Sequence, residues 1–238
     1  MTHNITISHE ISESLRSDIL GNRYLSGDRL PSERDLATRF RSSRGAVREG
    51  LSQLEQIGLI RIMPGGARVQ PIENASLGVL GPLLEFGETP DPKLVDQFLE
   101  AFGALASVTA RSAVEKASQE ELNQLQQLVV NLAKQNNISD KAQQQWRGLF
   151  EAMAEIADNL VIRLISNDLR AQFLDHMTSL GINLDQRERL AASTLKNLKY
   201  SLKQADAELT GKAIFDHFAD LRIAVSNRIS DLETEAQA

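Results

Sequence analysis

The stretch that decides the fold runs from Arg29 to Glu55 and reads RLPSERDLATRFRSSRGAVREGLSQLE. Apolar residues at helical spacing predict two short helices in it, joined by a tight turn. Arg44 and Arg48 lie near the start of the second helix. A helix with arginines at its N-terminal end, after such a turn, is typical of a helix-turn-helix that reads bases in the DNA major groove. This segment therefore predicts DNA binding.

Serines mark where both helices are expected to begin. Ser32 is a plausible cap for the first helix, with Asp35 as the acid of a capping box. Either Ser42 or Ser43 is expected to cap the second helix. The residues expected to face the core of the motif are Leu36, Phe40, Val47, Leu51 and Leu54.

The motif is flanked by a further helix and by a β-hairpin. Apolar residues every four positions from Ile7 to Ile19 predict the earlier helix, with Ser8 as its N-cap. Residues 59–63 and 67–70 read as two strands around the turn Pro64-Gly65-Gly66. Three helices and this hairpin together predict a winged helix-turn-helix domain over residues 1–72.

The rest of the chain is expected to be a second, all-helical domain over residues 76–238. Residues 71–76 form a short predicted linker, and an apolar face from Val95 to Thr109 indicates a long helix. Further helices are expected at about 118–135, 141–157, 159–181, 186–204 and 207–234. The predicted fold class is therefore mainly α, with the hairpin as its only β-structure.

Composition excludes several classes of protein. The chain has no cysteine, so disulfides and thiolate metal sites are excluded. No apolar run approaches the roughly 20 residues that span a bilayer. The N-terminus lacks a basic region followed by an apolar core, so no secretory signal is expected. These features favour a cytoplasmic protein with no membrane partner.

Charge is distributed unevenly along the chain. The net charge is −6, but residues 1–72 hold ten Arg, no Lys and eight Asp plus Glu, which gives +2. Residues 73–238 carry the remaining −8. Within 29–48, six Arg oppose Glu33 and Asp35, which gives +4. An arginine cluster on an otherwise acidic chain provides a local field that attracts phosphates.

On these residues the chain resembles the GntR family of bacterial transcription regulators. The matching segments are LPSERDLA at 30–37, SRGAVREGL at 43–51 and LEQIGLI at 54–60. The resemblance covers about 60 residues. An all-helical C-terminal domain, with Phe150 to Asn159 and Ala205-Asp206 followed by His217, looks like the FadR subfamily, which has a bundle of six or seven helices.

The resemblance implies a homodimer that binds a palindromic operator. Arg34, Arg44 and Arg48 match the family's DNA-contacting arginines, and the glycines after Pro64 would place the wing near the minor groove. Pro64 itself departs from the usual glycine. For each arginine alone a solvated surface charge is the simpler interpretation, but three in register favour DNA contact. The DNA-binding residues so implied are Arg34, Ser43, Arg44, Gly45, Ala46, Arg48, Gly65 and Gly66.

Many members of this subfamily hold a metal ion in the bundle with an Asp and three His. In this chain Arg147, Glu151 and Leu195 stand at three of those positions, and only His217 remains. One imidazole and one carboxylate do not make a convincing site. We therefore expect no metal and no other cofactor.

Without a metal, an anionic effector would need protein cations. Arg147 and Arg163 are candidates, because a guanidinium can bind a carboxylate with two hydrogen bonds. Intra-bundle or surface salt bridges are an equally good interpretation of both. Trp146 either lines a cavity or anchors the core, and the core is favoured. The candidate effector-binding residues are Arg147, Glu151, Arg163 and His217.

The effector is expected to be a small carboxylate or an acyl-CoA. Another branch of the subfamily lacks the metal and binds a long acyl-CoA. Residues 215–222 look somewhat like the final helix of that branch but lack its small polar and Trp residues.

Three functions remain to be weighed. The favoured one is a dimeric repressor that is controlled by a metabolite bound in the helical domain. The alternative is a DNA-binding dimer whose helical domain is purely structural and binds no effector. An enzyme is not expected, since the sequence has no nucleophile elbow, no phosphate-binding glycine loop and no paired catalytic His.

Overall fold

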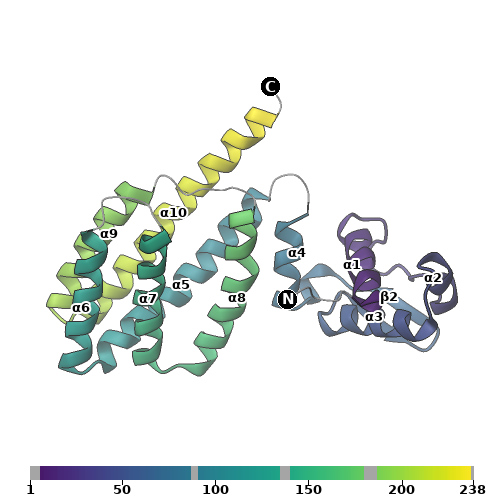
Figure 1. Cartoon of the computed structure of the whole chain (residues 1–238), viewed down its shortest axis with the longest axis horizontal. Helices are drawn as coiled ribbons and strands as arrows, with labels where there is room; N and C mark the ends of the chain where they lie inside the picture. The colour runs from purple at the N-terminus through teal and green to yellow at the C-terminus, as the bar shows by residue number, and fades with distance from the viewer. Residues whose placement is uncertain (1–5, 87–90, 135–139, 180–186, 237–238) are drawn as a thin grey trace. The chain divides into compact units, whose positions relative to one another are not determined.

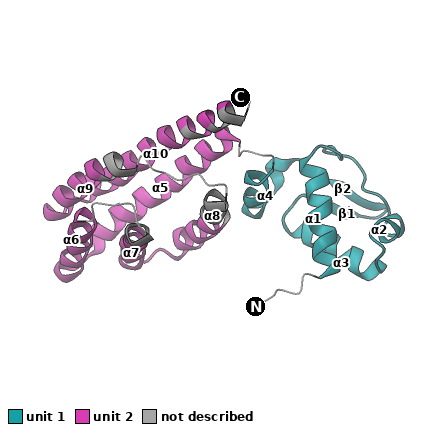
Figure 2. Ribbon diagram, turned by 45° about the horizontal axis from the view of Figure 1, so that its top comes forward, with its two compact units in different colours: residues 1–88 teal, residues 89–238 magenta. Residues whose placement is uncertain are grey.

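The computed structural model describes residues 6–86, 91–134, 140–179 and 187–236 (Figure 1). The chain divides into two compact units, residues 1–88 and residues 89–238 (Figure 2). The described residues are mainly helical, with one two-stranded antiparallel sheet in the first unit. This confirms the predicted fold class. No helix in the described ranges is both long and apolar enough to cross a membrane.

The first unit has the predicted order of three helices and a hairpin. Its elements are α1 (Ile7–Leu20), α2 (Glu33–Arg39), α3 (Arg44–Gln56), β1 (Ile60–Met63) and β2 (Gly66–Val69). The core of this unit is formed by side chains from all five elements, and Leu36, Val47 and Leu54 are fully buried in it. Phe40 is partly buried and packs against the same core.

Caps explain where these helices begin. The Ser32 hydroxyl accepts a hydrogen bond from the Asp35 amide at 3.3 Å and donates one to its carboxylate at 2.6 Å. This is the predicted cap of α2. The prediction of Ser8 as the cap of α1 is wrong, since Thr6 is the N-cap and accepts from the His9 amide. Ser8 lies inside the helix and is buried, with its hydroxyl 2.9 Å from that of Thr6.

The hairpin is closed by a turn at Pro64-Gly65, and Met63 pairs with Gly66. Both glycines have positive φ, 101° at Gly65 and 125° at Gly66. Side chains with a Cβ rarely adopt that region, so the turn requires glycine at these positions. An extended segment at Arg29 adds a bridge to Arg68 on the free side of β2.

Residues 72–84 complete the first unit. They form two short 3₁₀ turns, Ile72–Asn74 and Leu77–Val79, and the helix α4 (Leu80–Leu84). Val79 is buried in the core of the first unit and Leu83 packs against that core. The helical domain is predicted to start at residue 76, whereas the second compact unit starts at Thr89, because this packing holds α4 with the first unit.

The described part of the second unit contains six helices. They are α5 (Pro92–Lys116), α6 (Gln119–Ala133), α7 (Asp140–Ala157), α8 (Leu160–Ser179), α9 (Arg187–Lys203) and α10 (Ala207–Ala236). The long helices α5 and α10 lie side by side, α7 packs on α5, and α9 packs on both α6 and α10 (Figures 1 and 2). The bounds of α6 to α10 agree with the predicted ranges to within two residues, and α5 extends beyond the predicted apolar face at both ends.

Two contacts fix α10 against α5. Gly103 permits a close approach, because a Cβ built on it would come within 2.5 Å of the Phe218 Cβ. Two hydrogen bonds of 2.7 Å join the Arg222 guanidinium to the Asp96 carboxylate. This bonding to Arg222 holds the pKa of Asp96 below its ordinary value. Phe218 is thereby held at a defined place in the bundle.

Candidate functional site

The N-terminal end of α3 is the first part of the candidate DNA-binding surface. The Ser43 hydroxyl accepts a hydrogen bond from the Ala46 amide at 3.2 Å, so Ser43 is the cap of α3. Gly45 is exposed, and a Cβ built there would meet only the Ser43 hydroxyl within 4 Å. Ala46 is partly buried and packs against the core. The exposed backbone at Gly45 leaves room for close approach of a partner.

The three predicted DNA-contacting arginines are all exposed. Arg48 forms a two-point ion pair with Glu33 of α2, with nitrogen–oxygen distances of 3.2 and 2.9 Å. This hydrogen bonding lowers the pKa of Glu33, with a smaller contribution from the charge of Arg44. Arg44 therefore acts on Glu33 through its charge rather than through an ion pair of the kind that Arg48 makes.

The wing carries further arginines that were not among the predicted DNA-binding residues. Arg61 of β1 and Arg68 of β2 are paired directly across the hairpin, and both are exposed. Like charges directly opposite one another destabilise a strand pair. Arg29 lies against Gly66, where a built Cβ would come within 2.9 Å of its Nε. A sequence signal exists for Arg68, which lies between the buried Ala67 and Val69, whereas Arg61 has a buried neighbour only at Ile60.

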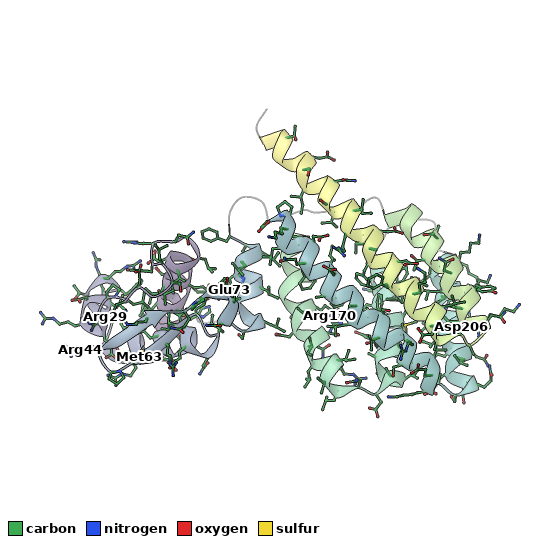
Figure 3. The ribbon with its side chains drawn as sticks, turned by 180° about the vertical axis from the view of Figure 1, so that it is seen from behind. Arg29, Arg44, Met63, Glu73, Arg170 and Asp206 are labelled. Carbon is green, nitrogen blue, oxygen red and sulfur yellow. The ribbon has the colours of Figure 1, made fainter. Side chains whose placement is uncertain are left out.

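A surface of exposed arginines on a recognition helix and a wing suits the phosphate backbone and the base edges of duplex DNA. Figure 3 labels Arg29, Arg44 and Met63, which all belong to the first unit. The fold and these side chains together define the class of the first unit, a winged helix-turn-helix of the DNA-binding kind.

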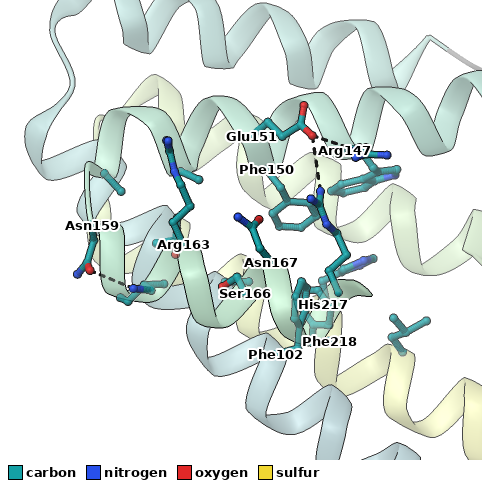
Figure 4. A pocket seen from close by; sticks show the side chains of 18 of the residues that line it. Phe102, Arg147, Phe150, Glu151, Asn159, Arg163, Ser166, Asn167, His217 and Phe218 are labelled. Atoms are coloured by element: carbon teal, nitrogen blue, oxygen red, sulfur yellow. Dashed lines mark hydrogen bonds and ion pairs between the residues drawn. The ribbon is translucent and has the colours of Figure 1, made fainter. Parts of the chain in front are cut away.

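The second candidate site is a cavity in the helical unit, with a volume of about 610 Å³. Its walls come from α5, α7, α8 and α10, and all four predicted effector residues line it (Figure 4). These residues are Arg147, Glu151, Arg163 and His217. A volume of this size is typical of pockets for small-molecule ligands.

One side of the cavity is aromatic. The Trp146 ring stacks on His217 at 5.1 Å with an interplanar angle of 12°, and lies 6.0 Å from Phe150. Phe218 meets Phe102 edge-on at 5.4 Å. The chain has only eight Phe, two Tyr and one Trp, yet four of them line this cavity. The favoured interpretation of Trp146 as a core anchor is therefore replaced by a place in the cavity wall.

The other side is polar and belongs to α8. Arg163, Ser166, Asn167 and Arg170 recur at helical spacing and line the cavity. Glu151 of α7 lies 2.9 Å from Arg147 and 3.6 Å from Arg170. The Arg163 guanidinium makes no hydrogen bond or ion pair with any described residue. Three arginines and one glutamate leave this cavity with a formal charge of +2.

The residues at the subfamily's metal-ligand positions do not fit a metal. The Thr194 hydroxyl lies 3.1 Å from Nδ1 of His217, and Arg147 is paired with Glu151. Leu195 is a buried apolar side chain. Over the described ranges, no three His, Asp or Glu residues come together in a way that could hold a metal ion. No step of the function proposed below depends on a metal.

Residues 7–69 match the model of the family described as "Bacterial regulatory proteins, gntR family". The chain therefore carries a GntR-family DNA-binding domain, as the sequence predicts. The family description and the names of the relatives described next all denote regulatory proteins.

Several relatives bear the name "Fatty acid metabolism regulator protein". The one from Shewanella halifaxensis is 32% identical over 124 residues, 51% of this chain and 49% of that protein. The one from Proteus mirabilis is 25% identical over 198 residues, 82% of this chain and 81% of that protein. The chain thus spans about half the length of the Shewanella relative in the more similar alignment.

One solved structure extends the likeness to most of the chain. It is described as "Lar controls the expression of the Listeria monocytogenes agr system and mediates virulence" and has a TM-score of 0.55 at 17% identity. The match covers 92% of this chain and 96% of that one. A likeness at this identity shows the fold alone.

Proposed function

We propose that the protein is a dimeric transcription regulator that binds a palindromic DNA operator and responds to a small anion in the cavity of its helical unit. The exposed arginines of α2, α3 and the wing carry the DNA-binding half of this proposal. The family match over residues 7–69 and the names of the relatives support the same conclusion. The proposed DNA contacts are Arg34, Ser43, Arg44, Gly45, Ala46, Arg48, Gly65 and Gly66, together with Arg61 and Arg68.

The cavity supports control by a ligand. Three arginines line this cavity, and Arg170 is only 31% exposed, so an anion that enters the cavity can be bound by guanidinium groups. The proposed effect is a population shift, in which the ligand favours one arrangement of the two DNA-binding domains of the dimer. The purely structural alternative leaves the polar wall of the cavity unexplained.

Self-association is supported by an exposed apolar face on α8. Leu160, Val161 and Leu164 are 68%, 66% and 58% exposed. Contiguous exposed apolar residues are typical of protein-protein contacts. A palindromic site requires two copies of the recognition helix, and we infer that this face contributes to the contact between two copies of the chain.

The DNA-binding proposal is tested with the full chain. DNA fragments are first selected from a random-sequence pool by binding to the parent protein, and affinity is then measured by gel shift. We expect Arg44→Ala combined with Arg48→Ala to weaken binding by about 100-fold, because each arginine that contacts DNA is worth roughly 1–3 kcal/mol. Arg111→Ala in the helical unit serves as the control. Equal binding by the parent and the double variant would reject the assignment.

A further inference from the structure

Helix α8 lines the cavity with both apolar and polar residues. It buries Leu169, yet Arg163 and Arg170 line the cavity while Leu160 and Leu164 are exposed. A bundle helix ordinarily turns its apolar face to the core. The mixed surface of α8 places two guanidinium groups at a cavity whose other wall is aromatic. A ligand with a polar group that binds these arginines would explain this arrangement.

The opposite wall indicates what the remainder of that ligand is. Trp146, Phe150 and His217 form a stack along α7 and α10, and Phe218 continues it toward α5 (Figure 4). Flat aromatic faces pack well against other flat rings and against apolar groups. The cavity therefore offers an apolar surface and a cationic surface that face the same space.

We propose that the cavity binds a compact organic carboxylate with a flat apolar body, and that it does so without a metal. The carboxylate is held by Arg163 and Arg170, with the Asn167 amide as a further donor. The apolar body lies against Trp146 and Phe150. This inference rests on the proposed ligand-controlled function and gives the chemical class of the ligand.

Glu151 acts as an internal counter-ion in the empty cavity. It lies 2.9 Å from Arg147 on its own helix but 3.6 Å from Arg170 on α8. The longer pair is the weaker one, so a ligand carboxylate can replace Glu151 at Arg170 while Glu151 keeps Arg147. Arg163 has no competing carboxylate among the described residues. Ligand binding thus exchanges one α7–α8 ion pair for ligand contacts.

The volume of the cavity favours a compact carboxylate over an acyl-CoA as the ligand. About 610 Å³ is ample for a ligand with one or two rings. An acyl-CoA is a much larger polyanion, and its several phosphates would need more cations than the three arginines that line this cavity.

The single tryptophan makes the proposal directly testable on the full-length protein. Trp146 fluorescence is titrated with benzoate, phenylacetate and 3-phenylpropionate, with the corresponding amides as neutral matched controls, and with acetate and palmitoyl-CoA. We expect a saturable change with at least one aromatic acid and binding of its amide weaker by about tenfold or more. A response equal for acid and amide, a response to palmitoyl-CoA alone, or no saturable response to any acid would overturn the proposal.

Variants locate the binding group. Arg163→Gln and Arg170→Gln should each weaken binding of the responding acid by about tenfold or more, while Glu151→Gln should strengthen it because a competing carboxylate is removed. Arg111→Gln, outside the cavity, should leave it unchanged, and circular dichroism checks that each variant is folded. Unchanged affinity in both cavity-arginine variants would reject the site.

The selected DNA fragment distinguishes this inference from the proposed function. DNA binding without any response to the acids would overturn the ligand class alone. A response to the acids without DNA binding would reject the proposed regulatory function but would still support the proposed ligand class.

Discussion

Helices α3 and α8 carry similar residues in opposite arrangements. The first buries Val47, Leu51 and Leu54 and exposes its arginines, whereas the second lines a cavity with its arginines and exposes Leu160 and Leu164. Both arrangements hold guanidinium groups ready for an anion. The arginines of α3 lie on a convex helix surface, where they can contact an extended polyanion such as DNA, while those of α8 line a cavity that suits a small molecule. The placement of arginine, rather than its presence, decides the class of partner.

The largest expected effect is a loss of stability in the helical unit that leaves the DNA-binding unit with α3 unchanged. Gly103→Val places a side chain where even a Cβ comes within 2.5 Å of Phe218. We expect overpacking to destabilise the helical unit by roughly 1–3 kcal/mol. Thermal unfolding followed by Trp146 fluorescence measures it. An unchanged melting temperature would show that α10 can shift freely, and Gly148→Ala, where a built Cβ meets nothing within 4 Å, is the control.

The outward face of α8 offers a second way to sharpen the comparison. Leu160→Asp combined with Leu164→Asp should weaken self-association by about tenfold or more, since charges are depleted from the cores of protein interfaces. Sedimentation equilibrium measures the change. The control is Tyr200→Asp on α9, which is 61% exposed. If both variants keep the oligomeric state of the parent, the face has another role.

A substitution in the wing tests whether its exposed arginines contribute to DNA binding while lowering the stability of the first unit. Arg61→Gln removes a like-charge pair with Arg68, so the first unit should become more stable by about a few tenths of a kcal/mol. The same change should reduce the slope of log affinity against log salt by about 1. Denaturant unfolding and salt-dependent DNA binding measure the two effects. Loss of stability with an unchanged salt slope would contradict the assignment.

The smallest expected effect concerns the ion pair that supports the cavity wall. Because the pKa of Asp96 is lowered from its ordinary 3.8 by hydrogen bonding to Arg222, the pair stabilises the fold above that value and loses its contribution as pH falls through the lowered pKa. Asp96→Asn should therefore be less stable than the parent near pH 7 and nearly equal to it at strongly acid pH. Both partners are partly exposed, so the difference should be small. A difference that persists unchanged in acid would point to packing instead.

Local signals explain why much of the first unit could be predicted. Ser32 with Asp35, Ser43 before an apolar stripe, and the glycines after Pro64 each act within a few residues, and the structure has them in the expected roles. The cap of α1 was missed because Thr6 and Ser8 are equally good capping residues by type. The choice between them depends on the burial of Ser8 against α3, where the Ser8 carbonyl closely approaches Gly50.

The cavity could be predicted only in part, because it is assembled from helices far apart in the sequence. Arg147, Glu151 and His217 were predicted from a family pattern and Arg163 from the carboxylate-binding chemistry of a guanidinium, and the structure brings all four to one cavity. Arg170 was missed although it follows Arg163 by seven residues on the same face of a predicted helix. The exposure of Leu160 and Leu164 on α8 has no sequence signal, because the sequence of a helix does not show which of its apolar residues a neighbouring helix will cover.

The most direct test compares two double variants on one selected DNA fragment. The account predicts that Arg44→Ala with Arg48→Ala weakens DNA binding by about 100-fold, while Arg163→Gln with Arg170→Gln binds the DNA as tightly as the parent. It would be contradicted if the α8 variant, folded by circular dichroism, lost DNA binding to the same extent, or if the α3 variant kept it.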